Sequence, residues 1–219
     1  MERTPLKSAG AKLILITGGA RSGKSAFAEK YAAQTSGKDG KVAYIATAQV
    51  YDEEMKFRVR RHRARRPRNW QTFEAPTEEA VLAALQQAGD TCDVILFDCL
   101  TMFLSNFLCN LSEEELQEEE RLYQQAEQIG ERLLETTSQM TCTRALVMVT
   151  NEVGEGIVPQ NHLARVYRDL AGLLSQQLAR AAEAVYLVSC GQAVNLKSLA
   201  LSPEEAVRRD FGDFYYFSV

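Results

Sequence analysis

The sequence predicts an α/β fold with a mostly parallel central sheet flanked by helices. Short apolar runs rich in β-branched residues alternate with longer segments of helical periodicity, and this alternation is typical of a parallel sheet covered on both faces. The chain has 219 residues, of which 46% are hydrophobic, so it can bury a substantial core without cross-links. We expect one domain over residues 1–219, with residues 1–12 and about 198–219 peripheral to it.

The expected elements alternate regularly along the chain. Five apolar runs are expected to form buried strands: Leu13–Thr17, Val42–Thr47, Val94–Asp98, Leu146–Thr150 and Val185–Ser189. Segments with helical periodicity lie between them: Lys24–Ala33, Glu53–Arg65, Thr77–Gln87, Ser112–Thr136 and Leu163–Ala184. Ligands of open parallel sheets bind at the carboxyl ends of the strands. Polar residues follow all five expected strands and should crowd this edge: Gly18–Ser25, Thr47–Gln49, Asp98 with Thr101, Asn151–Glu152 and Cys190–Gln192.

Composition and charge exclude several classes of protein. The net charge of −4 provides no global basic field for nucleic acid or an anionic membrane. The longest apolar runs, such as Leu13–Ile16, are far shorter than the roughly 20 residues that a membrane span requires. The first twelve residues lack the apolar core of a secretory signal, and the five cysteines are odd in number without a CxxC pair. We therefore expect a cytoplasmic protein with no nucleic-acid partner and no membrane span.

The segment that follows the first expected strand reads GGARSGKS and satisfies the phosphate-loop pattern G-x-x-x-x-G-K-[ST]. Glycines allow backbone N–H groups to turn toward phosphate oxygens, and the following helix adds partial positive charge. Lys24 would reach the β- and γ-phosphates, and the Ser25 hydroxyl would ligate Mg²⁺. The alternative is a glycine-rich turn that matches by chance. The expected nucleotide-binding residues of this loop are Gly18, Gly19, Ala20, Arg21, Ser22, Gly23, Lys24 and Ser25.

Asp98 directly follows the apolar run Val94–Phe97. An apolar strand that ends in a carboxylate is typical of sites where the carboxylate organises Mg²⁺ and its waters. Asp98 and Ser25 are the expected metal-binding residues. In the alternative interpretation, Asp98 caps the turn that follows.

A basic segment runs from Asp52 to Pro67 and reads DEEMKFRVRRHRARRP. Met55, Val59 and His62 share one helical stripe, so His62 is expected on the inward face while most arginines point outward. His62 is then either a half-buried structural histidine or a nucleophile toward phosphorus, since neutral imidazole attacks phosphorus well. The arginines either bind phosphates or form a solvated face. His162, the other histidine, is expected at the surface or as a capping residue.

Taken in order, the motifs resemble those of one enzyme family, and the resemblance spans about Leu13 to Gly191. The motifs are GGARSGKS, YIATAQ followed by DEEM, RHRARRP-x-x-W, Asp98–Thr101 with Leu104–Asn106, TNEVGEGIVP, and Arg168–Asp169. They look like the bifunctional adenosylcobinamide kinase / adenosylcobinamide-phosphate guanylyltransferase of cobalamin biosynthesis. Ser175 and Glu155 depart from the family pattern, in which Asn and an aromatic residue are expected.

The resemblance implies a RecA-like P-loop NTPase fold and a homotrimer. It also implies phosphorylation of adenosylcobinamide by ATP or GTP, and then transfer of GMP from GTP to adenosylcobinamide phosphate through a guanylylated histidine. The family's histidine falls on His62, which with Lys24 forms the expected catalytic pair. The nucleotide contacts that the resemblance implies beyond the phosphate loop are Ala48, Gln49, Val50, Arg65, Arg66, Pro67, Arg68, Glu74 and Asp98.

Two other functions compete with this one. The first is a P-loop small-molecule kinase without nucleotidyl transfer, in which His62 is structural. The second is a non-enzymatic nucleotide switch whose basic helix binds an acidic partner. For an enzyme, we expect Glu152 to activate the acceptor hydroxyl.

Overall fold

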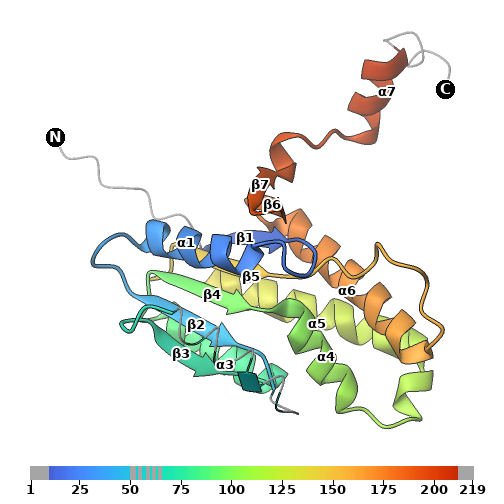
Figure 1. Cartoon of the computed structure of the whole chain (residues 1–219), viewed down its shortest axis with the longest axis horizontal. Coiled ribbons are helices and arrows are strands. Elements are labelled where there is room, and N and C mark those ends of the chain that lie inside the picture. Colours follow the sequence, from blue (N-terminus) through green and yellow to red (C-terminus); the bar gives the residue numbers. More distant parts are fainter. Residues whose placement is uncertain are drawn as a thin grey trace.

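The computed structural model describes residues 10–49 and 66–211 and, between these ranges, residues 53, 56, 57, 60 and 63. Within this part of the chain, seven strands form one sheet in the order β3-β2-β4-β5-β1-β6-β7 (Figure 1). All neighbouring strands are parallel except β6 and β7, which are antiparallel. The strands are β1 (Lys12–Thr17), β2 (Val42–Ala46), β3 (Gln71–Glu74), β4 (Val94–Asp98), β5 (Ala145–Val149), β6 (Ala184–Ser189) and β7 (Gln192–Asn195).

Helices connect the parallel strands. They are α1 (Lys24–Ser36), α3 (Glu78–Gly89), α4 (Leu100–Cys109), α5 (Glu119–Gln139), α6 (His162–Ala181) and α7 (Pro203–Phe211), with short 3₁₀ turns η1 (Glu115–Gln117) and η2 (Leu196–Ser198). Three of these α-helices begin at capping side chains, and at the start of α7 the hydroxyl of Ser202 accepts a hydrogen bond from the N–H of Glu205. Thr77 accepts a hydrogen bond from the N–H of Ala80 at the start of α3, and Asn161 accepts one from Ala164 at the start of α6.

The sheet carries a hydrophobic core on each face. On one face, Ala28 and Ala32 of α1 pack against side chains of the central strands, including Ile16 and Tyr44. On the other face, α3, α5 and α6 cover the sheet through residues such as Val81, Leu133 and Leu174. Strands β1, β2, β4 and β5 are therefore buried on both faces, which explains their continuous apolar sequences.

A third apolar cluster joins α4, α5 and α6 beyond the end of the sheet. Leu104 and Leu108 of α4 pack with Leu122 of α5 and with Val166 and Leu170 of α6. This cluster holds α4, which begins two residues after Asp98, against α5 and α6. It also includes Val153, so that α6 lies beside the loop that follows β5.

All five predicted strands are confirmed, each within one residue of its expected bounds. The helix expected over Ser112–Thr136 is instead η1 followed by α5, because Glu118 has a non-helical ψ of 64°. The last helix expected before the final strand ends at Ala181 rather than Ala184, which already belongs to β6. The helix expected over Glu53–Arg65 lies for the most part outside the described residues.

Four elements were not predicted. Strands β3 and β7 have four residues each and lie at the two edges of the sheet, where their side chains are only partly buried. Helix α4 reads LTMFLSNFLC and begins only two residues after Asp98. Its apolar sequence follows that of β4 so closely that the two elements look like one apolar segment. Helix α7, in the C-terminal region expected to be peripheral, lies apart from the sheet (Figure 1).

The predicted fold class is confirmed: the chain is an α/β protein with a mostly parallel sheet and flanking helices, and its phosphate loop joins β1 to α1. Strand β5 lies between β1 and β4 in the sheet. Among the described residues, no helix combines the length and the apolar character needed to cross a bilayer.

Candidate active site

The loop between β1 and α1 has a backbone that only glycine permits at its first position. Gly18 lies against β6, and a Cβ built on it would be 2.3 Å from the carbonyl oxygen of Val188. Gly23 has a φ of 98° and immediately precedes α1, where no side chain of the described residues caps the helix. The first N–H groups of α1 therefore point into the loop without a side-chain acceptor, as an anion-binding helix N-terminus requires.

Lys24 lies inside this loop rather than on the surface. It is 8% exposed, and its Nζ donates a hydrogen bond to the carbonyl oxygen of Gly19 at 2.9 Å. Burial lowers the pKa of Lys24, and this effect is opposed by the nearby Cys99 and Asp98. A buried ammonium next to free helix N–H groups is an arrangement that phosphate oxygens can complete.

Asp98 lies at the carboxyl end of β4, in register with Ala46 of β2. Its Oδ2 accepts a hydrogen bond of 2.5 Å from the hydroxyl of Tyr44, a residue of β2 that is 1% exposed. Burial raises the pKa of Tyr44 well above its ordinary value, and the Asp98 carboxylate raises it further. Tyr44 therefore keeps its proton and acts as a donor to the carboxylate.

Ser25 and Asp98 supply the oxygen donors that Mg²⁺ prefers. In the part of the chain that the structure describes, no group of three or more His, Cys, Asp or Glu side chains is arranged to hold a metal ion. Mg²⁺ in nucleotide sites is commonly held by one or two protein groups together with substrate phosphates and water. One hydroxyl and one carboxylate at the phosphate loop fit that type of site, and they do not fit an all-protein metal cage.

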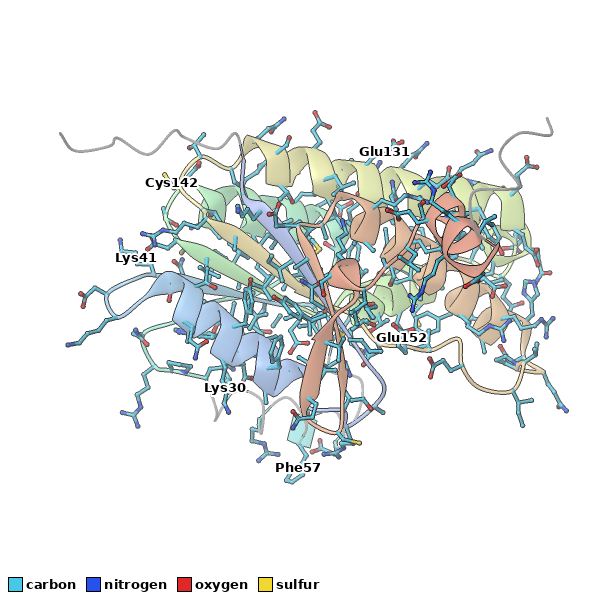
Figure 2. The ribbon with its side chains drawn as sticks, turned by 90° about the horizontal axis from the view of Figure 1, so that it is seen from above. Lys30, Lys41, Phe57, Glu131, Cys142 and Glu152 are labelled. Carbon is cyan, nitrogen blue, oxygen red and sulfur yellow. The ribbon has the colours of Figure 1, made fainter. Side chains whose placement is uncertain are left out.

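Glu152 follows β5 and lies against the beginning of the phosphate loop (Figure 2). Its Oε1 accepts a hydrogen bond from the hydroxyl of Thr17, and its backbone N–H donates to the carbonyl oxygen of Gly18 at 3.2 Å. The neighbouring Asn151 donates from Nδ2 to the hydroxyl oxygen of Thr101 in α4 at 2.5 Å. The loop after β5 is thus attached both to the phosphate loop and to α4, and it presents a carboxylate between them.

Arg66 lies near Asp98 on the β2 side of β4, whereas the phosphate loop lies on the β5 and β1 side. Its guanidinium carbon lies 3.4 Å from the centre of the Tyr44 ring, which is cation–π contact. The turn that carries Arg66 continues through Pro67 and Arg68, both exposed, to Trp70, whose N–H donates to the carbonyl oxygen of Pro67 at 3.1 Å. Tyr44 therefore contacts both Asp98 and this turn.

The other predicted site residues are placed as follows. Ala48 and Gln49 follow β2 and are partly buried, and Glu74 ends β3, where its Oε1 lies 3.8 Å from the guanidinium of Arg63. Three predicted residues lie outside the described residues: Val50, His62 and Arg65. His162 is at the surface as expected, where its Nε2 is 2.7 Å from Oε1 of Glu119.

Sequence reasoning assigned no role to two buried polar side chains of the site, Tyr44 and Asn106, although both lie within motifs of the family resemblance. The Nδ2 of Asn106 donates to the carbonyl oxygens of Thr47 at 2.7 Å and Pro76 at 3.0 Å, and thereby ties α4 to the ends of β2 and β3. Thr47 in turn exchanges two hydrogen bonds of 2.8 Å with the backbone of Cys99. A lone amide within the apolar sequence of α4 was the available signal for Asn106.

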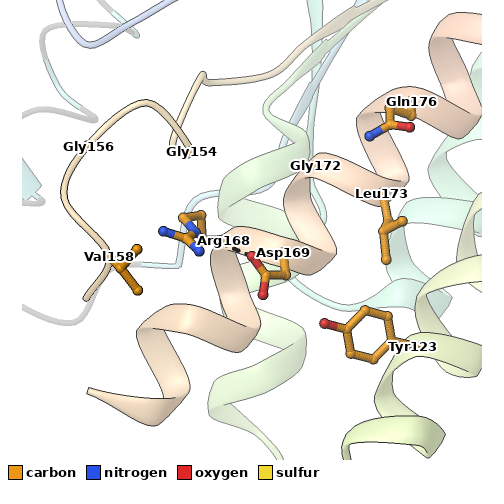
Figure 3. A pocket seen from close by; sticks show the side chains of 9 residues that line it. All are labelled: Tyr123, Gly154, Gly156, Val158, Arg168, Asp169, Gly172, Leu173 and Gln176. Atoms are coloured by element: carbon orange, nitrogen blue, oxygen red, sulfur yellow. Dashed lines mark hydrogen bonds and ion pairs between the residues drawn. The ribbon is translucent and has the colours of Figure 1, made fainter. Parts of the chain in front are cut away.

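A concave region away from the phosphate loop lies between α5, α6 and the loop after β5, with a volume of about 570 Å³. Figure 3 shows Arg168 and Asp169 of α6 facing this space, with Arg168 Nε 3.3 Å from Asp169 Oδ1. Ser175 does not line it, because its hydroxyl lies 3.2 Å from that of Thr150 at the end of β5. The lining residues are Tyr123, Gly154, Gly156, Val158, Arg168, Asp169, Gly172, Leu173 and Gln176.

This combination of a phosphate loop, a strand-end carboxylate and an arginine turn matches a known family. Residues 14–196 match the family model described as cobinamide kinase / cobinamide phosphate guanyltransferase. The chain belongs to this family. The match covers every described residue of the phosphate loop, the arginine turn and both loops that follow β4 and β5.

Curated relatives support the membership over most of the chain. The bifunctional adenosylcobalamin biosynthesis protein CobU of Salmonella typhimurium is 40% identical over 186 residues, which is 84% of this chain and 99% of that protein. CobP of Pseudomonas aeruginosa, with the same description, is 40% identical over 183 residues, or 84% of this chain and 96% of that protein.

Solved structures of similar architecture include the ATPase domain of G40P and the RadB recombinase. The first has a TM-score of 0.47 at 15% identity and covers 80% of this chain and 68% of that chain. The second has a TM-score of 0.44 at 12% identity and covers 82% of this chain and 74% of that chain.

Proposed function

We propose that this protein is a bifunctional enzyme that first phosphorylates adenosylcobinamide and then guanylylates the product. In the first reaction, the terminal phosphoryl group of ATP or GTP passes to the hydroxyl of the aminopropanol arm, releasing the nucleoside diphosphate. In the second, GMP passes from GTP to adenosylcobinamide phosphate, giving adenosylcobinamide-GDP and pyrophosphate. The family membership and the names of the relatives support both reactions over the plain kinase.

The observation that carries this proposal is the convergence of three anion-binding or metal-binding features at one sheet edge. The buried Lys24, the Asp98 carboxylate and the Arg66 guanidinium lie on neighbouring elements, connected through Tyr44 and the end of β4. Phosphoryl transfer depends mostly on positioning and charge stabilisation, which is what such a set of side chains provides.

In the kinase step, the N–H groups at the start of α1 and the Lys24 ammonium bind the β- and γ-phosphates and stabilise the charge that develops on transfer. Ser25 and Asp98 would hold Mg²⁺, which neutralises phosphate charge when bound. Glu152, attached to the first turn of the phosphate loop, is our proposal for the group that accepts the proton of the acceptor hydroxyl.

In the transferase step, we assign the nucleophile to His62. Its neutral imidazole attacks the α-phosphorus of GTP, a P–N bond forms, and pyrophosphate leaves. The acceptor phosphate then attacks the same phosphorus and restores the histidine. Of the nucleotide contacts proposed for this step, Ala48, Gln49, Arg66, Pro67, Arg68 and Glu74 belong to the described residues, whereas His62, Val50 and Arg65 are assigned on the sequence alone.

The cellular form of the enzyme is part of the same proposal. We place residues 1–219 in one nucleotide-binding domain with peripheral ends, assembled as a homotrimer in the cytoplasm. All five cysteines are free, which supports a reducing compartment.

Acceptor dependence tests the proposed function directly. The purified protein should turn over ATP to ADP and GTP to pyrophosphate only when adenosylcobinamide or its phosphate is supplied, each in a 1:1 ratio to the corrinoid product. Without acceptor, pyrophosphate release should stop at one molecule per active site, the amount that guanylylates His62. A nucleotide switch would bind GTP without acceptor-dependent turnover, and that result would refute the enzyme. Kinase turnover with no pyrophosphate release would reduce the proposal to the plain kinase.

A further inference from the structure

Tyr44 is a buried residue of the site to which the family motifs assign no role. It lies in the middle of β2, and a phenylalanine would fill the same apolar space between α1 and the sheet. What a phenylalanine would lack is the hydroxyl, which donates to Oδ2 of Asp98 at 2.5 Å. The hydroxyl therefore serves the carboxylate rather than the core.

The register of the sheet explains why this tyrosine reaches this carboxylate. Tyr44 is paired with Leu96, and Asp98 lies two residues further along β4 on the same face, which is the face covered by α1. The long phenol side chain extends toward the carboxyl end of the strands and meets Asp98 there. The contact joins residues 54 positions apart in the sequence.

The Tyr44 ring makes a second set of contacts, with the turn that carries Arg66. The Arg66 guanidinium carbon lies 3.4 Å from the ring centre, and the Trp70 ring lies 6.5 Å away, so the turn between them packs on Tyr44. The Nε of Arg66 is buried and has no hydrogen-bond partner among the described residues. The ring therefore contacts the guanidinium directly, and the Tyr44 hydroxyl adds an electrostatic interaction with the same side chain.

We propose that Tyr44 is a positioning residue that holds Asp98 and Arg66 in one fixed arrangement, so that the metal-binding carboxylate and the phosphate-binding guanidinium act on the same bound nucleotide. Its hydroxyl orients the carboxylate and its ring orients the guanidinium. The proposal rests on the proposed function for the reactions it serves, but metal and nucleotide binding can test it without either reaction.

The two halves of the side chain can be removed separately. Tyr44→Phe deletes the hydroxyl and keeps the ring, so Mn²⁺ should bind about tenfold or more weakly in the presence of a non-hydrolysable GTP analogue, as is usual when a partner of a metal ligand is lost. Tyr44→Leu also deletes the ring and with it the cation–π contact to Arg66. At saturating Mn²⁺, this variant should therefore bind the analogue about fivefold more weakly than Tyr44→Phe does, because an ordinary cation–π contact contributes a factor of that size. Mn²⁺ binding is measured by electron paramagnetic resonance, and analogue binding by calorimetry.

Two controls separate positioning from general packing. Tyr31→Phe alters a tyrosine of the same core face whose ring packs against Phe27 and Tyr186, and it should leave both affinities unchanged. In an Asp98→Ala background, Tyr44→Phe should change Mn²⁺ affinity by less than about twofold, because the group through which Tyr44 acts is gone. A folded Tyr44→Phe protein that binds Mn²⁺ as tightly as the parent would overturn the proposal, and so would an equal loss in the Asp98→Ala background.

A measurement on the unsubstituted protein covers the case in which Tyr44→Phe does not fold. With ¹³C at the ζ-carbon of every tyrosine, Mn²⁺ and the GTP analogue should selectively broaden a tyrosine signal, and Asp98→Ala should abolish that broadening. If no tyrosine signal broadens selectively, Tyr44 does not contact the metal-binding carboxylate and the proposal fails. Because no step of this test requires turnover, an inactive protein would refute the proposed function and leave this result standing.

Discussion

Replacing Lys24 by methionine removes the ammonium of the phosphate loop while keeping most of its apolar stem. Because Lys24 is 8% exposed and its Nζ is held 2.9 Å from the carbonyl oxygen of Gly19, little solvent is present to screen the charge. Loss of one such preorganised donor typically costs about 10²–10³ in rate, or roughly 2.7–4 kcal/mol of transition-state stabilisation. We expect Lys24→Met to lower both the kinase and the transferase rate by at least about a hundredfold.

The fold should survive this change. Burial lowers the pKa of Lys24, which means that the folded state disfavours the ammonium, so an uncharged side chain should not lower the free energy of unfolding. Rates are measured as corrinoid phosphate and pyrophosphate formed, alongside urea unfolding. Lys30→Met is the matched control, because Lys30 lies on the exposed face of α1 (Figure 2). A folded Lys24→Met enzyme that keeps either rate within tenfold of the parent would refute the reasoning.

Three further predictions concern the metal, the loop and the cysteines. Asp98→Asn should raise the Mg²⁺ concentration needed for half-maximal turnover about tenfold or more, and an unchanged requirement would make Asp98 structural. Gly18→Ala should destabilise the fold in urea unfolding because its Cβ would meet the Val188 carbonyl oxygen, whereas Gly19→Ala, with open space around its Cβ, should not; equal stability would contradict the close approach. Burial raises the pKa of Cys99 to about 11, so iodoacetamide at pH 8 should spare it, and Cys99 labelling in the native protein by mass spectrometry would count against its burial. The cysteines expected to react are the exposed Cys109, Cys142 and Cys190.

The pKa of Cys99 also sets the sign of a stability change. The thiol prefers its proton more strongly in the folded state than in the unfolded chain, whose pKa is near 9. Its contribution to the free energy of unfolding is therefore complete below pH 9 and is lost as the pH rises toward 11.

The parts of the fold that the sequence predicts are those whose physics is local. Strands β1, β2, β4 and β5 are covered on both faces, so nearly every position is apolar and the runs are visible without knowledge of the partners. The phosphate loop is equally visible because its glycines, lysine and serine must lie at fixed spacing within one short segment to surround a phosphate.

The parts that were missed depend on tertiary pairing. Strand β3 (QTFE) has no apolar run and exists because β2 offers it an edge. Helix α4 is buried along most of its length among α5, α6 and the sheet, so its sequence continues the apolar run of β4 and does not stand out as a separate element. The contact between Tyr44 and Asp98 follows from the register of β2 with β4, which no pattern within either strand contains.

The covalent intermediate tests the central claim most directly. If His62 is the nucleophile, the enzyme incubated with GTP labelled at the α-phosphorus and without acceptor should carry GMP through a P–N bond that is labile in acid and stable in base. Label at the γ-phosphorus should not be retained. His62→Ala should lose the label and the transferase reaction but keep kinase activity, whereas His162→Ala, altered at a surface residue that contacts Glu119, should retain both. An adduct that persists in His62→Ala and is lost in His162→Ala would contradict the account, and a wild-type enzyme that forms no adduct under any condition would favour the plain kinase.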